Sequence, residues 1–276
     1  NPYSRLGNAT SDLKYFTQMF SMFSQSCLPG GAYQFWNVSD HLFYRDDRFL
    51  HSYRNSRVQH AGMLEDYAHM IRAALRLYEC FGEDAYLNEA IRWSAAVETL
   101  FADAKGGYFQ SASDASDLVV RQKPFMDNAV PSGNAIMAQN LAKLYALTGD
   151  AQYRDQAEIT LAAFGGRISE QFPNMPGLMM AAEMLQNPVQ IVLIANERSQ
   201  TYLDMRRAIF GAYLPNRAIT ILSDGDPLPD GHPAQGKTAI DGKETAYICQ
   251  GPVCSAPVTG VEELTEMLAD LPAKAA

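Results

Sequence analysis

The stretch Leu64–Glu79 reads LEDYAHMIRAALRLYE, and its apolar residues recur at the i, i+3, i+4, i+7 spacing of an amphipathic helix. Phe81-Gly82-Glu83-Asp84 follows as a helix stop and restart, because glycine readily takes the left-handed conformation found just after a helix end. A second helix is expected from about Asp84 to Phe101. The sequence therefore predicts a helical hairpin with a short turn.

The hairpin is repeated along the chain. A second pair of helices is expected over residues 132–147 and 151–164, with Thr148-Gly149-Asp150 as the break. A third unit begins at Pro176. The repeat is visible at a constant offset, where Leu77-Tyr78, Gly82, Tyr86 and Ala90 correspond to Leu144-Tyr145, Gly149, Tyr153 and Ala157. Stacked hairpins of this kind predict a solenoid or a closed α/α toroid.

Two inserts and a change of pattern complete the expected organisation. Phe49–Val58 alternates loosely and indicates an extended segment, and Gly106–Phe109 with Leu118–Val120 predicts a β-hairpin insert. After Asn187 strands and helices alternate, with strands expected at 189–195, 218–222 and 245–249 and helices at 200–214 and 261–271. We therefore divide the chain into a helical-hairpin region, 1–187, of which 1–44 carries no assignable pattern, and a small α/β element, 188–276.

Composition excludes several classes of protein. The 276 residues include 22 Lys and Arg against 31 Asp and Glu, a net charge of −9, which argues against a nucleic-acid partner. The longest apolar runs are too short for a membrane span. Four cysteines do not make a disulfide scaffold, so a reducing, cytoplasmic location is expected. We find no P-loop, dinucleotide fingerprint or nucleophile elbow, and expect no cofactor.

Polar residues precede or open the expected inner helices. In a toroid of helical hairpins these helices begin at one mouth, so their first turns converge there. Carboxylates at such a mouth can act as general acid and base, with neighbouring amides and hydroxyls holding sugar hydroxyls. The plainer interpretation is that acids at helix N-termini stabilise the helix dipole. The catalytic candidates are Glu65, Asp66 and Asp127, and the substrate-binding candidates are Asn128, Ser132 and Asn134, with Ser132 also a predicted N-cap.

The segment before the first inner helix carries further candidates. His51 could move a proton, and Tyr53 and Arg54 could orient a substrate's hydroxyl or carboxylate groups. His60 is a weaker candidate of the same kind. Each of these side chains, taken alone, is more often an ordinary surface residue.

Metal binding is not expected. Glu65 and His69 have i, i+4 spacing but no third ligand, so an exposed helical pair is the better interpretation. Cys249 and Cys254 form a C-x₄-C pair whose only nearby histidine is His232. A packed pair of thiols is favoured there, and a redox pair is the alternative.

Several separate motifs, in order, resemble one family, the YyaL-like thioredoxin-domain proteins, which have animal members named spermatogenesis-associated protein 20. The motifs are RFLHSYR (Arg48–Arg54), LEDYAHMIRAALRLYE (Leu64–Glu79), GGYF (Gly106–Phe109), LVVRQKPFMDNAVPSGN (Leu118–Asn134), YLPNRAI (Tyr213–Ile219) and TAYICQGPVCSAPVT (Thr245–Thr259). The resemblance covers about Arg45 to Leu271. It implies a thioredoxin-like domain followed by an (α/α)₆ toroid of the six-hairpin glycosidase or N-acylglucosamine 2-epimerase type, of which this chain would be the C-terminal part.

Two functions follow from these patterns as hypotheses. The first is a carbohydrate-active enzyme, a sugar epimerase, isomerase or glycoside hydrolase that binds a small sugar-like ligand. The second is a non-catalytic binding or scaffold module that partners a thioredoxin-like domain. The fold expected for both is mainly α: part of an α/α toroid with a β-hairpin insert and a C-terminal α/β element.

Overall fold

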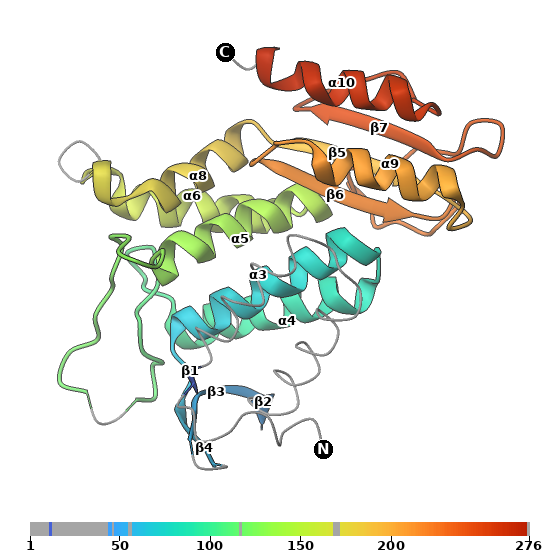
Figure 1. The fold of residues 1–276 in the computed structure, drawn as a ribbon. Helices are drawn as coiled ribbons and strands as arrows, with labels where there is room; N and C mark the ends of the chain where they lie inside the picture. The colour runs from blue at the N-terminus through green and yellow to red at the C-terminus, as the bar shows by residue number, and fades with distance from the viewer. Residues whose placement is uncertain are drawn as a thin grey trace. The chain divides into compact units, whose positions relative to one another are not determined.

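The computed structural model describes residues 11–12, 44–45, 47–54, 57–115, 118–167 and 172–274 (Figure 1). Contacts between Cα atoms divide the chain into two compact units. The first comprises the described parts of residues 1–78, 83–140 and 156–181, and the second comprises 79–82, 141–155 and the described part of 182–276. Most of the expected N-terminal segment 1–44 lies outside the described residues.

The helices expected in the hairpins are confirmed with closely matching ends. The paired helices are α3 (Leu64–Phe81) and α4 (Asp84–Phe101), then α5 (Gly133–Thr148) and α6 (Ala151–Gly165). Gly82 and Gly149 lie at the two breaks with φ of 68° and 76°, the left-handed conformation that favours glycine. A 3-10 turn, η2 (Phe172–Asn174), precedes α8 (Pro176–Gln186). The chain is therefore mainly α and built on helical hairpins.

A small antiparallel sheet in the first unit precedes α3. Its strands are β1 (Ser11–Asp12), β2 (Tyr44–Arg45), β3 (Arg48–Arg54) and β4 (Arg57–Ala61). Strand β3 pairs with the other three, so the extended segment expected near Phe49 is the central strand. This β3–β4 pair, rather than residues 106–120, supplies the β-hairpin of the helical region.

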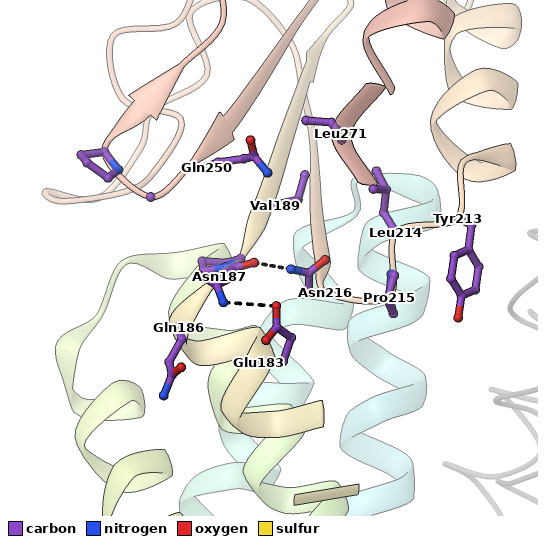
Figure 2. A pocket seen from close by; sticks show the side chains of 13 residues that line it. Glu183, Gln186, Asn187, Val189, Tyr213, Leu214, Pro215, Asn216, Gln250 and Leu271 are labelled. Atoms are coloured by element: carbon purple, nitrogen blue, oxygen red, sulfur yellow. Dashed lines mark hydrogen bonds between the residues drawn. The ribbon is translucent and has the colours of Figure 1, made fainter. Parts of the chain in front are cut away.

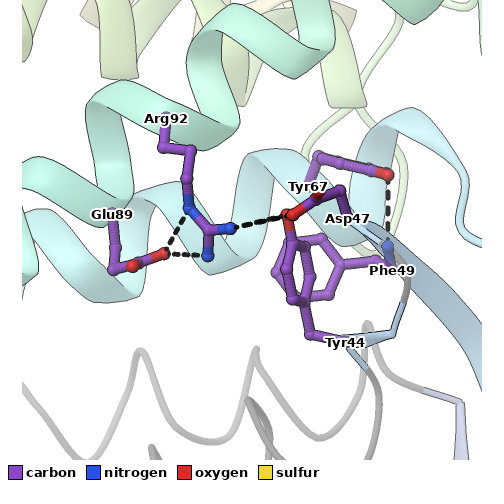
Figure 3. A network of polar contacts seen from close by, with 6 residues as sticks. All are labelled: Tyr44, Asp47, Phe49, Tyr67, Glu89 and Arg92. Atoms are coloured by element: carbon purple, nitrogen blue, oxygen red, sulfur yellow. Dashed lines mark hydrogen bonds and ion pairs between the residues drawn. The ribbon is translucent and has the colours of Figure 1, made fainter.

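Aromatic packing fixes β3 against the helices. The Phe49 side chain is fully buried, and its ring centroid lies 4.9 Å from those of both Tyr67 and Trp93. The Phe49 N–H donates to the Tyr67 hydroxyl at 3.1 Å (Figure 3). Nearby, Arg92 donates to the Tyr44 hydroxyl at 3.0 Å and pairs with Glu89 (Figure 3). Burial raises the pKa of Tyr44 to about 12, so this hydroxyl keeps its proton at neutral pH.

The segment after α4, where the sequence predicted a β-hairpin, forms a loop instead. Gly106 and Gly107 do shape a turn, with φ of 86° and 70°, but only an isolated bridge joins Ala102 to Tyr108. Carbonyl groups in this loop are satisfied by side chains instead of a second strand. Arg121 donates to the Ser111 carbonyl and Lys123 donates to the Gly106 carbonyl at 2.7 Å. The described residues of this segment therefore form an irregular loop.

The second unit contains the predicted α/β element. Strand β5 (Val189–Ile194) pairs in parallel with β6 (Arg217–Leu222) and antiparallel with β7 (Thr245–Gln250), and β7 pairs with the two-residue β8 (Val253–Cys254). The sheet order is β6-β5-β7-β8, which places β8 at an edge. Helices α9 (Gln200–Gly211) and α10 (Val261–Lys274) pack on one face of this sheet through their apolar residues.

A buried ion pair ties helix ends to this sheet within the second unit. The Glu79 side chain is fully buried and accepts from the Lys143 ammonium at 2.8 Å and from the Ile219 N–H at 3.2 Å. Lys143 also donates to the Arg217 carbonyl. Because both charges have partners, the pair holds α3, α5 and β6 together without an uncompensated buried charge.

None of the described helices is long and apolar enough to cross a membrane.

The cysteine pair of the second unit is oxidised. Cys249 on β7 and Cys254 on β8 are directly opposed in the strand register and joined by a disulfide, with Cα atoms 3.9 Å apart. The favoured sequence interpretation, a packed pair of thiols, is therefore wrong. The hairpin brings the two residues face to face, and C-x₄-C spacing alone does not reveal this register.

Candidate functional site

The starts of three helices lie side by side in the first unit. A Cβ added to Gly133, at the start of α5, would lie 3.0 Å from the Leu64 side chain and 3.2 Å from Cγ of Glu65, at the start of α3. A Cβ added to Gly177, near the start of α8, would lie 2.8 Å from both Ala135 Cβ and Asp127 Oδ2. Glycine thus allows the helix starts to approach closely, and polar groups from all three come together.

A histidine and an aspartate meet at the start of α3. His51 Nδ1 lies 2.9 Å from Asp66 Oδ2, and the same oxygen accepts from the Met63 N–H at 2.8 Å. Asp66 has a fully buried side chain, whereas the His51 side chain is 17% exposed. Phe49 and His51 share a face of β3 because side chains alternate along a strand, so the aromatic packing of Phe49 also fixes His51. The carboxylate holds the ring at Nδ1, and the ring edge reaches solvent.

Asp127 lies between two other helix starts and contacts both. Its Oδ1 accepts from the Ser132 N–H at 2.8 Å, and its Oδ2 accepts from the Gly177 N–H at 2.6 Å. The Asp127 N–H in turn donates to the Asn174 carbonyl at 2.7 Å. Both oxygens of the carboxylate therefore satisfy N–H groups that a helix start leaves without partners. This geometry favours a positioning role for Asp127.

Two of the predicted substrate-binding residues are engaged inside the protein. Ser132 caps α5, because its hydroxyl accepts from the Ala135 N–H at 3.2 Å, as the sequence predicted. Asn134 is fully buried, accepts from the Tyr108 N–H at 2.8 Å and donates to the Tyr108 and Pro124 carbonyls. An amide that is fully buried and bonded in this way is out of reach of a sugar hydroxyl. We therefore correct the substrate-binding assignment of Asn134 to a structural one.

The other predicted residues occupy the edges of this region. Asn128 is exposed beside Asp127, and Glu65 is half-buried at the start of α3. Tyr53 and Arg54 lie at the end of β3, where the structure describes the backbone only. His60 is exposed on β4 with a φ of 64°.

A buried polar pair one turn further along α3 escaped the sequence interpretation. His69 is fully buried, and its Nδ1 accepts from Arg72 Nη2 at 3.1 Å, so the expected exposed Glu65–His69 pair is wrong. Burial lowers the pKa of Arg72 to about 10. Asp66, His69 and Arg72 follow each other at i, i+3 spacing along α3, a regular line of polar residues that could have revealed them. In the described part of the chain no group of three or more His, Cys, Asp or Glu residues could hold a metal ion.

The sequence of this chain is similar to those of several curated proteins. No protein-family model matches the sequence. Spermatogenesis-associated protein 20 from Homo sapiens is 33% identical over 217 residues, which cover 75% of this chain and 27% of the human protein. The same protein from Rattus norvegicus matches at 33% identity over the same share. The chain thus spans about a quarter of the length of the curated relatives it matches.

Two solved structures with a partial likeness to this chain are sugar-processing enzymes. The cellobiose 2-epimerase of Spirochaeta thermophila has a TM-score of 0.46 at 17% identity, covering 58% of this chain and 44% of the epimerase. A family 76 glycoside hydrolase from a bovine Bacteroides thetaiotaomicron strain has a TM-score of 0.49 at 12% identity, covering 97% of this chain and 57% of the hydrolase. Structural similarity at this level does not indicate which reaction this chain catalyses.

Proposed function

We propose that the chain belongs to the spermatogenesis-associated protein 20 family and that its first unit carries a carbohydrate-active site of the epimerase, isomerase or hydrolase type. In this proposal His51 is the general acid and base, and Asp66 orients it. One observation carries the assignment: a partly exposed imidazole held at Nδ1 by a fully buried carboxylate, 2.9 Å away.

The geometry suits proton transfer. Asp66 accepts from Nδ1–H, which sets the tautomer and ring orientation and stabilises the imidazolium when the ring gains a proton. Transfer to a substrate then passes through Nε2. In an epimerase or isomerase this nitrogen takes a proton from the carbon beside a carbonyl and returns it, and in a hydrolase it protonates the leaving oxygen.

The proposed substrate is a sugar, and its proposed binding site lies at the helix starts. The resemblance to six-hairpin proteins implies a carbohydrate pocket, and Glu65 and Asn128 lie near enough to the surface to contact hydroxyl groups. Asp127 is assigned the positioning of α5 and α8 beside this pocket, through its bonds to Ser132 and Gly177. No metal or cofactor has a place in this scheme.

The test compares two histidines of the same sheet. The protein is incubated with a panel of reducing sugars in D₂O, and exchange of the proton beside the carbonyl is followed by NMR, while aryl glycosides report hydrolysis. His51→Asn keeps a donor toward Asp66 but removes the titratable ring, and should slow turnover by about 10²–10⁴-fold. The control His60→Asn changes an exposed histidine at a positive φ that asparagine tolerates, and should leave turnover unchanged. Equal turnover in wild type and His51→Asn would refute the proposal.

A second candidate function is supported by the loop after α4. Leu118, Val119 and Val120 are 46%, 100% and 72% exposed, an unusual apolar run for a protein surface. This run favours the alternative hypothesis, a binding module that partners a thioredoxin-like domain. A purified thioredoxin-like domain should then bind the wild-type chain and lose binding to Val119→Asp, measured by calorimetry. Absence of binding to the wild-type chain would count against this alternative.

A further inference from the structure

The edge of the second unit's sheet carries a disulfide in an open position. Strand β8 has only two residues, Val253 and Cys254, and both are exposed. It follows β7 through Gly251-Pro252, and Cys254 is bonded to Cys249 directly across the hairpin. A disulfide at an exposed sheet edge can be reached by a thiol without unfolding of the core.

The two sulfur-bearing residues differ in accessibility. Cys249 is 2% exposed and lies on β7, inside the sheet. Cys254 lies on the outer strand and is exposed. An incoming thiolate must line up with the bond it breaks, so it reaches the sulfur of Cys254 and displaces that of Cys249.

The tip of the same hairpin forms one wall of a cavity. Gln250, Gly251 and Pro252 line a cavity of about 760 Å³, together with the chain around Val189 and the segment Tyr213–Asn216. Figure 2 shows Gln250 and Leu214 on opposite sides of Val189. The opposite wall is held rigid, since Asn216 donates to the Asn187 carbonyl and Asn187 donates to Glu183 (Figure 2). The cavity thus borders the tip of the disulfide-linked hairpin and is lined by its turn residues rather than by Cys249 or Cys254.

We infer that Cys249–Cys254 is a thiol–disulfide exchange site whose reaction partner is an external dithiol. The first thiolate of the dithiol attacks Sγ of Cys254, the bond between Cys254 and Cys249 breaks, and Cys249 leaves as a thiolate. The second thiol of the dithiol then attacks the first sulfur of the dithiol, which is bonded to Cys254 in the mixed disulfide. This closes the partner's disulfide and releases Cys254 as a thiolate. Two electrons and two protons pass from the dithiol to this chain, which ends as two thiols while the partner ends as a disulfide. The site is independent of His51 and of sugar chemistry.

The experiment uses the full chain and dithiothreitol as the dithiol. Native protein is exposed to dithiothreitol and then alkylated, and the tryptic peptide Glu244–Lys274, which contains both cysteines, is weighed. Circular dichroism recorded before alkylation reports whether the fold persists. We expect two labels on this peptide at unchanged circular dichroism, and none without dithiothreitol.

Single variants test the asymmetry of the attack. Cys249→Ser leaves the exposed thiol and Cys254→Ser leaves the buried one, each offered to oxidised glutathione. Mixed disulfide should form at least about tenfold faster in Cys249→Ser, because the exposed thiol is reached without opening of the core. Three results would overturn the inference: labelling of the native protein without dithiothreitol, resistance of the bond until the protein unfolds, or equal rates in the two variants. The first two need no variant, so the inference stays testable if either variant misfolds.

Discussion

Replacing Asp127 by asparagine tests whether this carboxylate acts as a clamp between helix starts. Its two oxygens accept from the N–H groups of Ser132 and Gly177, at 2.8 and 2.6 Å. Asparagine keeps one oxygen but presents an NH₂ group to the second N–H donor. One N–H group must therefore lose its acceptor, and two donors face each other.

The expected cost follows from these two bonds. A hydrogen bond to a charged group contributes about 1.5–3 kcal/mol, and a buried donor left without an acceptor adds to its loss. Asp127→Asn should therefore lower the free energy of unfolding by about 2–4 kcal/mol. If Asp127 only favoured a helix dipole, the cost would be at most about 1 kcal/mol.

Urea unfolding, followed by far-ultraviolet circular dichroism, measures this cost as a shift in midpoint at constant slope. Asp150→Asn is the matched control, because Asp150 is exposed and accepts one bond, from the Gln152 N–H at 2.9 Å. Asparagine caps a helix about as well as aspartate, so the control should change stability by less than about 0.5 kcal/mol. A wild-type midpoint for Asp127→Asn, combined with lost sugar turnover, would refute the clamp and restore a catalytic role.

Two further predictions concern the first unit. Burial raises the pKa of Glu98, whose carboxyl group accepts from the Tyr108 hydroxyl. The protonated carboxyl therefore stabilises the fold at pH values below its unfolded pKa, and this contribution is lost as the pH rises through the higher folded pKa. Urea titrations from pH 4 to 8 should show wild type losing stability relative to Glu98→Gln as pH rises, and a pH-independent difference would contradict this. Gly62→Ala should cost about 1–3 kcal/mol, because its Cβ would lie 2.7 Å from the Phe49 carbonyl oxygen. Gly165→Ala, which meets nothing within 4 Å, is the control, and equal midpoints would contradict the close approach.

The helices could be predicted from sequence because their signals are local. The apolar spacing of α3 and the glycines after it depend on neighbouring residues only, and Gly82 takes the expected left-handed conformation. The hairpin predicted around Gly106 failed for the opposite reason. Its glycine turn is local, but a strand needs a partner, and here Arg121 and Lys123 satisfy the loop carbonyls instead.

The candidate site was only partly predictable for the same physical reason. The helix start that contains Asp66 was recognisable, but its contact with His51 depends on how β3 packs through Phe49. Burial of His69 depends on the elements packed around α3, and the sequence spacing with Glu65 suggested an exposed pair. Which polar residues are enclosed and which reach solvent is decided by tertiary packing, which no local pattern contains.

The helix starts themselves explain why acids gather where the sequence predicted catalytic carboxylates. A helix start leaves four N–H groups without partners inside the helix, and a buried start must find acceptors for them. Asp66 accepts from the Met63 N–H, and Asp127 accepts from the N–H groups of Ser132 and Gly177. Both carboxylates therefore already stabilise helix starts. A group that changes its proton during a reaction would release such bonds in each cycle. His51 contacts Asp66 through Nδ1, and a histidine ring can both take up and release a proton. Under the proposed function, proton transfer is therefore assigned to His51, and Asp66 and Asp127 are assigned positioning roles.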